Sequence, residues 1–336
     1  MMRVLIIGTG SIGKKHFEVV RKVSPNSEIM MYSPSGKAFI SELKCIFTNN
    51  IENAIKFQPS LVIVASPSNT HIEYADLFIG HANGVLIEKP IAASLLEARA
   101  FADTLKESTT YIQVGYNLKY FKSLNLFRKI IRSNEFGVLY TLKSYVAQHL
   151  TTWRTSKDYR HTVSANKLKG GGVLLELSHE IDYLMWIMGR PVALCARVAK
   201  YSDMEIDVED YAAVDFFYNR PVSGEIVPVR LEMNFIDHKA ERNCTAIFKD
   251  ATVRWDGLSG SVQVFHKDKS VPTTIFHSDN ELFDSYVNQF SRFSQMASEK
   301  YRWKLSKENV DCATNVIEII DKIWVSHNAK GRLITV

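Results

Sequence analysis

The chain has 336 residues, which is long for one domain and favours two. Apolar residues make up 46% of it, yet no apolar run reaches the roughly 18 residues that a membrane-spanning helix needs. The net charge of +5 is modest and spread along the chain, so we expect no nucleic-acid partner and no membrane. The four cysteines form no C-x-x-C pair, so we expect neither a metal site nor a disulfide framework.

The N-terminal stretch MMRVLIIGTG contains a short apolar run that ends in glycines. A secretory signal peptide has a basic start, a longer apolar stretch and a small-residue cleavage site. The run fits a first β-strand better, and we expect a cytoplasmic protein.

The first part of the chain alternates between short β-branched runs and segments with helical periodicity. The runs are RVLII, EIMMYS, LVIVAS, GVLIEK and YIQVGY, and segments such as SIGKKHFEVVRKV and SLLEARAFADTLKE separate them. Apolar strands joined by helices indicate a parallel sheet that is covered on both faces. Right-handed crossovers make this a doubly wound α/β domain, which we place at residues 1–118.

The pattern changes near residue 118. An amphipathic helix, LKYFKSLNLFRKIIRSN, is followed by strands in which apolar and polar residues alternate, from VLYTLKSYVAQHL to SVQVFHK. Such alternation indicates a mostly antiparallel sheet with one packed face and one open face. A helical stretch over 171–189 interrupts the strands, and two more helices are predicted near 281–299 and 306–327. We predict that residues 119–336 form an α+β domain that binds substrate and forms a homodimer or homotetramer through the open sheet face.

Gly8, Gly10 and Gly13 have G-x-G-x-x-G spacing directly after the first strand and at the start of a helix. The first glycine allows the tight turn, the second lets backbone approach a pyrophosphate, and the third lets helix and strand pack closely. N–H groups at a helix N-terminus favour an anion, so we include Ser11 and Ile12 in a dinucleotide site. A plain strand–turn–helix loop and an S-adenosylmethionine site are the alternatives.

The stretch GVLIEKPIAA runs from an apolar strand directly into Glu88, Lys89 and Pro90. Proline fixes its own φ and favours an extended conformation in the preceding residue, so Lys89 is aimed from a strand end. At this edge of a doubly wound sheet, Lys89 is a candidate acid/base that exchanges a proton with a substrate hydroxyl or carbonyl while hydride moves. A surface Glu-Lys-Pro turn is the alternative.

The stretch GGGVLLELSHEIDYLMWIMG places Glu176, His179 and Asp182 three residues apart, on one face of a predicted helix. Polar side chains on an otherwise apolar helix need partners or solvent. We interpret this face as facing the substrate, with His179 binding a hydroxyl or relaying its proton and Asp182 holding His179 or a hydroxyl. A core helix with satisfied polar residues is the alternative.

These motifs together resemble the Gfo/Idh/MocA oxidoreductase family. The resemblance rests on GTGSIGKKH, ASPSNTH, IEKPIA, VGYNLKY, GGGVLLELSHEID and YVNQFSRF, and it runs over essentially the whole chain. The Glu-Lys-Pro element is its most specific motif. The resemblance implies an N-terminal Rossmann domain, a C-terminal open-faced sheet and a nicotinamide cofactor.

The resemblance also implies roles for individual residues. Lys89 would be the acid/base, Glu88 would lie by the nicotinamide ribose and Asn117 would lie near the nicotinamide. The family's C-terminal histidine maps to His179. The ASPSNTH loop would line the cofactor with Ser66, Pro67, Asn69 and His71.

The chain departs from the family's usual pattern near the predicted substrate. The family commonly has aspartate four residues before the histidine, whereas this chain has Glu176 three residues before His179. It usually has arginine after GYN-x, where this chain has lysine. The stretch TTWRTSKDYRHTVSANKLKGGG resembles a subgroup of the family, and its arginines would suit a phosphate or carboxylate, with solvated loop charges as the alternative. The candidate substrate residues are Lys119, Trp153, Arg154, Tyr159, Arg160 and Glu176.

The end of the second strand bears on the choice of dinucleotide. An NAD site normally has Asp or Glu about 20 residues past the glycine loop, where this chain has Ser33. A serine does not repel a 2′-phosphate, and Ser33, Ser35 and Lys37 can donate to phosphate oxygens. We therefore expect NADP in preference to NAD, with use of both as the alternative.

The sequence thus predicts an NAD(P)-dependent oxidoreductase that moves hydride between nicotinamide and a carbohydrate. The candidates are an amino sugar, a nucleotide-linked sugar and a cyclitol. A dinucleotide-binding regulator of the same fold without turnover, and a reductase of a non-sugar carbonyl or imine, are the alternatives.

Overall fold

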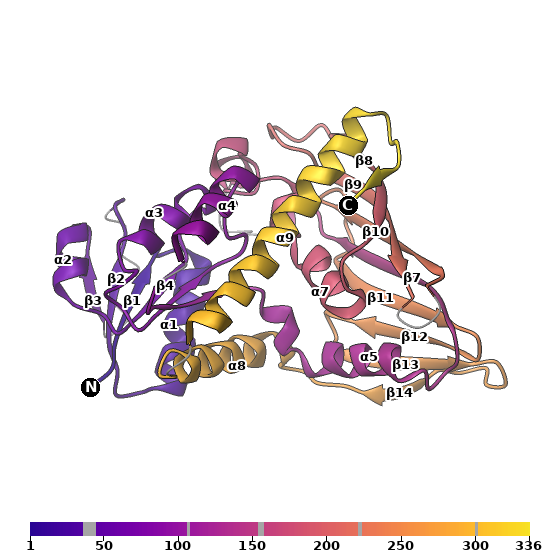
Figure 1. Ribbon diagram of the computed structural model, residues 1–336, viewed down its shortest axis with the longest axis horizontal. Helices are drawn as coiled ribbons and strands as arrows, with labels where there is room; N and C mark the ends of the chain where they lie inside the picture. The colour runs from indigo at the N-terminus through magenta and orange to yellow at the C-terminus, as the bar shows by residue number, and fades with distance from the viewer. Residues whose placement is uncertain (36–44, 106–107, 154–157, 221–223, 300–301) are drawn as a thin grey trace. The chain divides into compact units, whose positions relative to one another are not determined.

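The computed structural model describes residues 1–35, 45–105, 108–153, 158–220, 224–299 and 302–336 (Figure 1). The chain forms two compact units, and each is built from two segments of the sequence. Unit 1 comprises Met1–Asn117 and Phe283–Ile317, and unit 2 comprises Leu118–Leu282 and Glu318–Val336. No helix in these described ranges is long and apolar enough to cross a bilayer.

Unit 1 contains a six-stranded parallel sheet in the order β3-β2-β1-β4-β5-β6. All residues of β4, β5 and β6 are buried, as expected for continuous apolar strands covered on both faces. The strand order reverses between β1 and β4, where doubly wound sheets bind ligands outside the carboxyl ends of their strands. The strands are β1 (Arg3–Ile7), β2 (Glu28–Tyr32), β3 (Ile46–Thr48), β4 (Leu61–Val64), β5 (Gly84–Ile87) and β6 (Tyr111–Val114).

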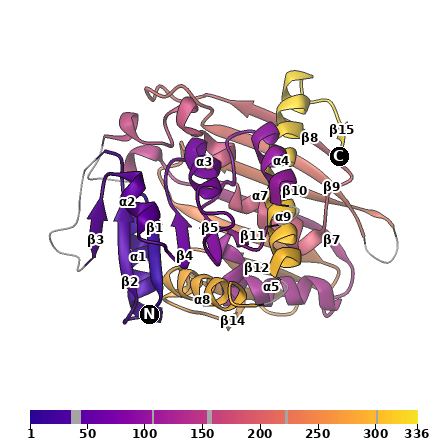
Figure 2. The ribbon, with the colours of Figure 1, turned by 60° about the vertical axis from the view of Figure 1, so that its left-hand side comes forward.

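Helices cover the sheet of unit 1. Phe17 and Val20 of α1 and Phe290 and Phe293 of α8 join side chains of β1, β2, β4, β5 and β6 in one buried cluster. Elsewhere α2 packs against β2 and β3, and α3 packs against β4 and β5 (Figure 2). The helices are α1 (Ser11–Val23), α2 (Ile51–Lys56), α3 (His71–Asp76), α4 (Leu95–Thr104), α8 (Glu281–Met296) and α9 (Arg302–Asn328), of which α8 and α9 also contribute residues to unit 2.

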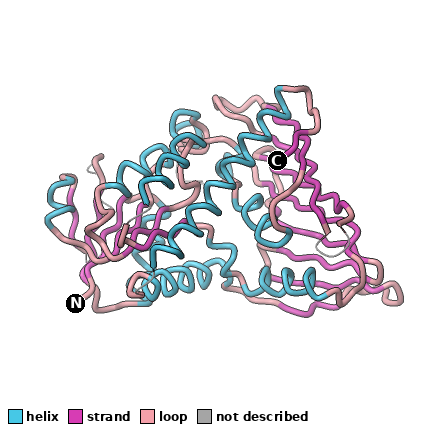
Figure 3. The backbone as a smooth tube through the Cα atoms, viewed as in Figure 1, coloured by secondary structure: helices cyan, strands magenta, loops and turns pink. Residues whose placement is uncertain are grey.

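Unit 2 contains a nine-stranded sheet in the order β14-β13-β12-β11-β7-β10-β9-β8-β15, drawn in magenta in Figure 3. Neighbouring strands are antiparallel except for β7 and β10, which are parallel. The strands are β7 (Leu139–Ala147), β8 (Ala193–Ala199), β9 (Tyr211–Asn219), β10 (Ile226–Asn234), β11 (Glu241–Phe248), β12 (Ala251–Asp256), β13 (Ser261–His266), β14 (Thr273–Phe276) and β15 (Ile334–Thr335).

One face of this sheet carries the buried side chains. Along β12 every second residue is buried, and Trp255 is fully buried with its ring edge-on to Phe121 and Tyr183. Helix α5 (Lys122–Ser133) packs against β12 and β13, and α6 (Val173–Glu176) packs against β9 and β10. The next helix, α7 (His179–Met188), supplies Tyr183 to this core.

The predicted fold class is confirmed, because unit 1 has a doubly wound parallel sheet and unit 2 has a mostly antiparallel one. Three details differ from the sequence prediction. The helix predicted over 171–189 is interrupted at Leu177 and Ser178, and the short strands β3, β14 and β15 were not predicted. Residues 283–317, which a single boundary at 118/119 assigns to the second domain, group with unit 1.

Candidate functional site

The glycine loop joins β1 to α1 in unit 1. Gly8 has φ +110°, and a Cβ on Gly8 would collide with the backbone of Ala65. A Cβ on Gly13 would collide with the Gly8 carbonyl, whereas a Cβ on Gly10 would meet nothing within 4 Å. Gly10 is the N-cap of α1 and contributes no side chain, so backbone N–H groups open the helix. These positions have the geometry that a backbone cradle for a pyrophosphate requires.

The loop after β4 carries the next group of predicted cofactor residues. Pro67 and Asn69 are exposed and Ser66 is half-buried. Thr70 Oγ1 donates to Ser66 Oγ over 2.8 Å, which orders the loop. The His71 side chain is buried, with Nδ1 2.7 Å from the Pro90 carbonyl oxygen and Nε2 2.9 Å from the Ser66 carbonyl oxygen. Its ring nitrogens therefore contact backbone of the protein.

The Glu88, Lys89 and Pro90 element follows β5 directly. Glu88 is buried, with Oε1 2.7 Å from His16 Nε2 and Oε2 accepting a hydrogen bond from Lys89 N over 3.2 Å. Burial alone raises the pKa of the Glu88 carboxyl, but the hydrogen bond from His16 and the charges of His16 and Lys89 outweigh burial, and the pKa is lowered. Lys89 is half-buried, and its peptide bond to Pro90 is cis.

His16 is a residue of this site that sequence analysis missed. It lies on α1 in the stretch SIGKKH, and the only available signal was its position three residues after Gly13 in the motif that carries the family resemblance. Its ring is also edge-on to Tyr286 of α8, with 5.5 Å between ring centroids.

Two other predicted cofactor residues lie at strand ends of unit 1. Asn117, after β6, is buried and its Nδ2 donates to Ser285 Oγ of α8 over 2.8 Å. Ser33, after β2, is buried, and its Oγ lies 3.1 Å from Ser35 Oγ. Lys37 lies outside the described residues.

In unit 2 the predicted acid–histidine–acid face is spread over α6 and α7. Glu176 ends α6, and its Oε2 accepts a hydrogen bond from Ser164 Oγ over 2.7 Å. His179 begins α7 and is 9% exposed. Asp182 is 3% exposed and pairs with Lys119, whose Nζ lies 2.8 Å from Asp182 Oδ1. Burial raises the pKa of Asp182, although Lys119 acts in the opposite direction.

A buried ion pair stands beside this face. Glu180, fully buried on α7, pairs with Arg242 of β11, with 2.8 Å between Oε1 and Nε. The first turn of α6 is held by Glu209, whose Oε1 accepts from Leu174 N over 3.1 Å. Burial raises the pKa of the Glu209 carboxyl. Sequence analysis identified neither contact, because each joins residues distant in the sequence.

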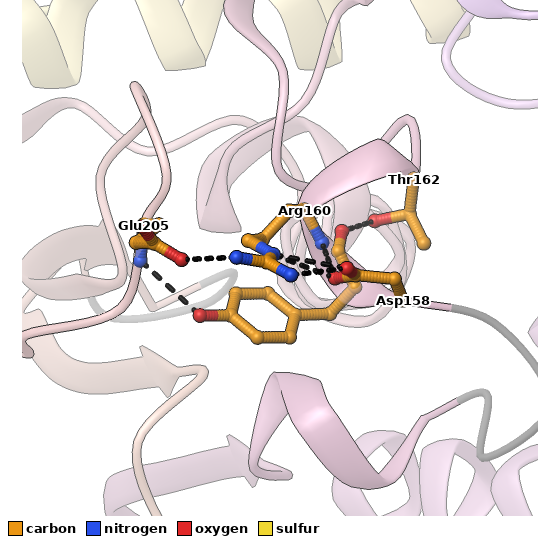
Figure 4. A network of polar contacts seen from close by, with 5 residues as sticks. Asp158, Arg160, Thr162 and Glu205 are labelled. Atoms are coloured by element: carbon orange, nitrogen blue, oxygen red, sulfur yellow. Dashed lines mark hydrogen bonds and ion pairs between the residues drawn. The ribbon is translucent and has the colours of Figure 1, made fainter.

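Figure 4 shows the polar contacts around Arg160, which is one of the predicted substrate residues. The Arg160 guanidinium donates to both oxygens of Asp158 and, through Nη1, to Glu205 Oε2 over 2.7 Å. Tyr159 Oη accepts from Glu205 N over 3.3 Å. Hydrogen bonds from Arg160 lower the pKa of Asp158 to about 2. Arg160 therefore joins two loops through two carboxylates, and the guanidinium is directed at them.

Trp153 and Arg154 complete the predicted substrate set. Trp153 Nε1 donates to the Gln148 carbonyl oxygen over 3.0 Å, and its ring is edge-on to Phe235 at 5.0 Å between centroids. Trp153 and Tyr159 line a small pocket with Leu150, Thr162 and Ser164. Arg154 lies outside the described residues. The part of the chain that the structure describes contains no group of three or more His, Cys, Asp and Glu side chains suited to a metal ion.

Two family models match the chain. One is described as "Oxidoreductase family, NAD-binding Rossmann fold" and matches residues 2–116. The other is described as "GFO/IDH/MocA C-terminal domain" and matches residues 125–248. Together they cover more than two thirds of the chain.

Known proteins resemble the chain in sequence and in fold. Glucose-6-phosphate 3-dehydrogenase of Bacillus subtilis (strain 168) is 25% identical over 64% of this chain and 63% of its own length. The chain spans between about half and two thirds of the length of this dehydrogenase and of two other curated relatives, an uncharacterized oxidoreductase of Streptococcus pneumoniae and the rhizopine catabolism protein MocA of Rhizobium meliloti.

Among solved structures, GenD2 from gentamicin A biosynthesis in complex with NAD has a TM-score of 0.77 and 21% identity, covering 100% of this chain and 96% of its own. An inositol dehydrogenase homolog complexed with NAD⁺ from Azotobacter vinelandii has a TM-score of 0.80 and 14% identity, covering 100% and 97%. These likenesses show a shared two-part fold. With both family models matched and the predicted motifs at the expected strand ends, the chain belongs to the Gfo/Idh/MocA oxidoreductase family.

Proposed function

We propose that the protein is an NAD(P)-dependent oxidoreductase that transfers hydride between nicotinamide and a carbohydrate hydroxyl or carbonyl. One observation carries this proposal. The glycine loop follows β1 and Lys89 follows β5, in a parallel sheet where β4 separates the two strands. Both therefore lie at the carboxyl edge of the sheet, beside the reversal of strand order where a dinucleotide binds.

The residues of unit 1 fit a dinucleotide. The turn at Gly8 and Gly10 and the open N-terminus of α1 would hold the pyrophosphate, since backbone N–H groups there favour an anion. The loop from Ser66 to Asn69 would line the cofactor, and Glu88 would lie by the nicotinamide ribose. When bound, the nicotinamide ring would accept the hydride from the sugar or donate it to the sugar.

Lys89 would move the proton that accompanies hydride transfer. Its ammonium donates hydrogen bonds and, once deprotonated, accepts the proton of a sugar hydroxyl. Its half-buried position after β5 keeps the side chain within reach of solvent and of the carboxyl edge of the sheet. In the reverse direction the same group would return the proton to the carbonyl oxygen.

His179, Asp182 and Glu176 of unit 2 would bind the sugar hydroxyls, and His179 would also relay a proton. These groups suit hydroxyls because a neutral imidazole both donates and accepts hydrogen bonds, and a carboxylate accepts a hydrogen bond from the hydroxyl. The names of several relatives support a carbohydrate: one is a glucose-6-phosphate 3-dehydrogenase and another an inositol 2-dehydrogenase. A further neighbour was solved with NADH and UDP-GlcNAcA. We propose an amino sugar, a nucleotide-linked sugar or a cyclitol.

Assembly and location are also part of the proposal. Exposed Tyr140 and Ile226 lie on β7 and β10 of the nine-stranded sheet, and apolar side chains on such a face are commonly covered by a second copy. We propose a homodimer or homotetramer through this sheet and a cytoplasmic location. Sedimentation of the purified chain tests the first statement.

The activity is tested with a panel of sugars and cyclitols, with each dinucleotide, on the wild type and Lys89→Met. We expect turnover of at least one carbohydrate and a fall in kcat of roughly 10²–10⁴ in the variant, with dinucleotide binding unchanged. Lys56→Met, at an exposed position of α2, is the matched control. A variant that keeps more than about a third of wild-type turnover contradicts the role of Lys89.

His179→Ala separates chemistry from structure in unit 2. We expect loss of turnover with an unchanged melting temperature, because α7 also buries the apolar side chains of Ile181, Tyr183, Leu184 and Ile187. A variant that melts far lower while its kinetics stay intact would assign His179 to the core. Dinucleotide binding without turnover of any sugar or carbonyl would favour the regulator of the same fold.

A further inference from the structure

Two buried histidines contact the residues on either side of Lys89. On one side, His16 Nε2 lies 2.7 Å from Glu88 Oε1, and the side chains of both residues are less than a tenth exposed. On the other side, His71 Nδ1 lies 2.7 Å from the Pro90 carbonyl oxygen. His16 comes from α1 and His71 from α3, so two helices reach the same three-residue element.

The first contact fixes the carboxylate that precedes Lys89. Glu88 Oε2 accepts a hydrogen bond from the backbone N–H of Lys89 while Oε1 faces His16. Gly115 lies against the same carboxylate, and a Cβ there would stand 2.9 Å from Glu88 Oε2 and 3.0 Å from Glu88 Cα. The Glu88 side chain is thus confined between α1 and the backbone after β6, and it restrains the Lys89 amide.

The second contact fixes the carbonyl that follows Lys89. His71 also reaches the Ser66 carbonyl oxygen with Nε2, over 2.9 Å, so one ring spans the loop after β4 and the turn after β5. A carbonyl oxygen only accepts hydrogen bonds, so each bond needs a proton on its ring nitrogen. A neutral ring satisfies one carbonyl and a doubly protonated ring satisfies both. In either form the ring fills the gap between the two loops.

We propose that His16 and His71 are positioning residues that hold Lys89 in place from both sides and connect it to the loops that border the dinucleotide. Neither residue needs to touch substrate for this role. His16 acts through the Glu88 carboxylate and His71 through the Pro90 carbonyl. The catalytic part of this inference rests on the proposed function, whereas the positioning of Lys89 is a property of unit 1 alone.

The glycine loop and the lysine are then coupled mechanically. His16 lies in the second turn of α1, whose first N–H groups form the pyrophosphate cradle, and His71 opens the helix after the ASPSNTH loop. A shift of either loop is transmitted to Glu88 or Pro90 by a buried hydrogen bond. Breaking that bond would leave a buried polar group without a partner, which destabilises the fold. Binding of the dinucleotide would therefore order Lys89.

The test compares His16→Phe, His16→Gln, His71→Phe and His71→Gln with the wild type. Phenylalanine keeps a ring of similar size but cannot bond. Glutamine at position 16 places an amide N–H near the position of Nε2. Glutamine at position 71 can contact only one of the two carbonyl oxygens that the His71 ring contacts. His81→Gln, at an exposed position, is the matched control. Hydrogen–deuterium exchange of the peptide spanning 84–93 reports the order of the Lys89 backbone without any substrate.

We expect exchange in 84–93 to accelerate at least about tenfold in both phenylalanine variants and in His71→Gln, and to stay near wild type in His16→Gln. Where a sugar is turned over, kcat should fall about 10- to 100-fold with sugar KM within about threefold, because alignment and not binding is lost. Unchanged exchange in soluble His71→Gln, or in soluble His16→Phe, overturns the proposal. If exchange accelerates in the variants but the wild type turns over no sugar, the positioning role is supported and the proposed function is refuted.

Discussion

Lys119 Nζ lies 2.8 Å from Asp182 Oδ1, and the Asp182 side chain is 3% exposed whereas that of Lys119 is 26% exposed. The lysine thus neutralises an interior carboxylate at the start of α7, next to His179 on the same helix. The Lys119 ammonium thus pairs with a carboxylate of the protein itself. This contact gives the lysine that replaces the family's usual arginine a role in holding α7.

The Lys119–Asp182 pair should contribute more to stability than an exposed ion pair of similar length, because Asp182 is buried. In Lys119→Met, Asp182 loses its cationic partner inside the protein, and the free energy of unfolding should fall by about 1–3 kcal/mol. Lys307→Met is the matched control, because Lys307 Nζ lies 2.7 Å from Asp311 Oδ2 with both side chains exposed. We expect the control to change stability by less than about 0.5 kcal/mol. Urea denaturation at neutral pH measures both, and equal losses would contradict the assignment.

The Glu88 carboxylate should make stability depend on pH in the acidic range. Its pKa in the fold is below the ordinary value of 4.5, so its ionised form is favoured in the native state. This contribution is complete above the ordinary pKa and is lost as the pH falls through the lowered one. The stability of the wild type relative to Glu88→Gln should be constant between about pH 5 and 7 and decrease below about pH 4.5. Denaturant titrations across this range measure it, and a constant difference down to pH 3 would contradict the sign.

Arg160 should affect phosphorylated and neutral sugars equally. Its guanidinium is directed at Asp158 and Glu205, so its loss loosens the junction of two loops without removing a phosphate ligand. We expect Arg160→Met to raise the KM of a phosphorylated sugar and of its unphosphorylated counterpart by the same factor, within about twofold. Arg230→Met, which breaks an exposed pair with Asp215 on the sheet, should change neither KM. A selective loss for the phosphorylated sugar would make Arg160 a phosphate ligand after all.

The fold was predictable where local sequence and tertiary packing agree. The sequence predicts a helix over 11–23, and α1 has these bounds, because Gly10 starts it and its buried residues recur with helical spacing. Short edge strands such as β3 and β15 carry too few residues for a periodic signal. The grouping of 283–317 with unit 1 was not predictable either, because the helical period of α8 is the same whichever sheet it covers.

The contacts that surround the candidate residues were less predictable than the residues themselves. The motifs place Glu88 and Lys89 at a strand end, because proline marks that turn in the sequence. His179 was predicted inside a continuous helix, whereas in the structure it begins α7. The motifs do not reveal that Glu88 meets His16, 72 residues away, or that Arg160 meets Glu205, 45 residues away. Such pairs depend on which elements become neighbours, and hydrophobic periodicity does not encode this.

The choice of dinucleotide depends on the end of β2. An NAD site there normally has a carboxylate that accepts hydrogen bonds from the ribose 2′-hydroxyl, and a carboxylate would repel a 2′-phosphate. This chain has Ser33, whose hydroxyl lies 3.1 Å from that of Ser35, so two hydroxyl groups stand where the carboxylate would be. Both can donate to phosphate oxygens, and Lys37, two residues after Ser35 in the sequence, carries a positive charge that would favour a phosphate.

We therefore expect NADP to bind at least as tightly as NAD. In Ser33→Asp, NADP binding should weaken by more than about tenfold, because the new carboxylate repels the 2′-phosphate. NAD has no 2′-phosphate, so its binding should change by less than about threefold. Lys37→Ala should weaken NADP and leave NAD unaffected. Fluorescence titration of the dinucleotide-free protein with each dinucleotide at one salt concentration measures these affinities, since salt screens the phosphate contacts. Lys56→Ala, at an exposed position of α2, is the control. A tenfold preference for NAD that persists unchanged in Lys37→Ala would show that the polar turn after β2 does not bind the adenosine phosphate.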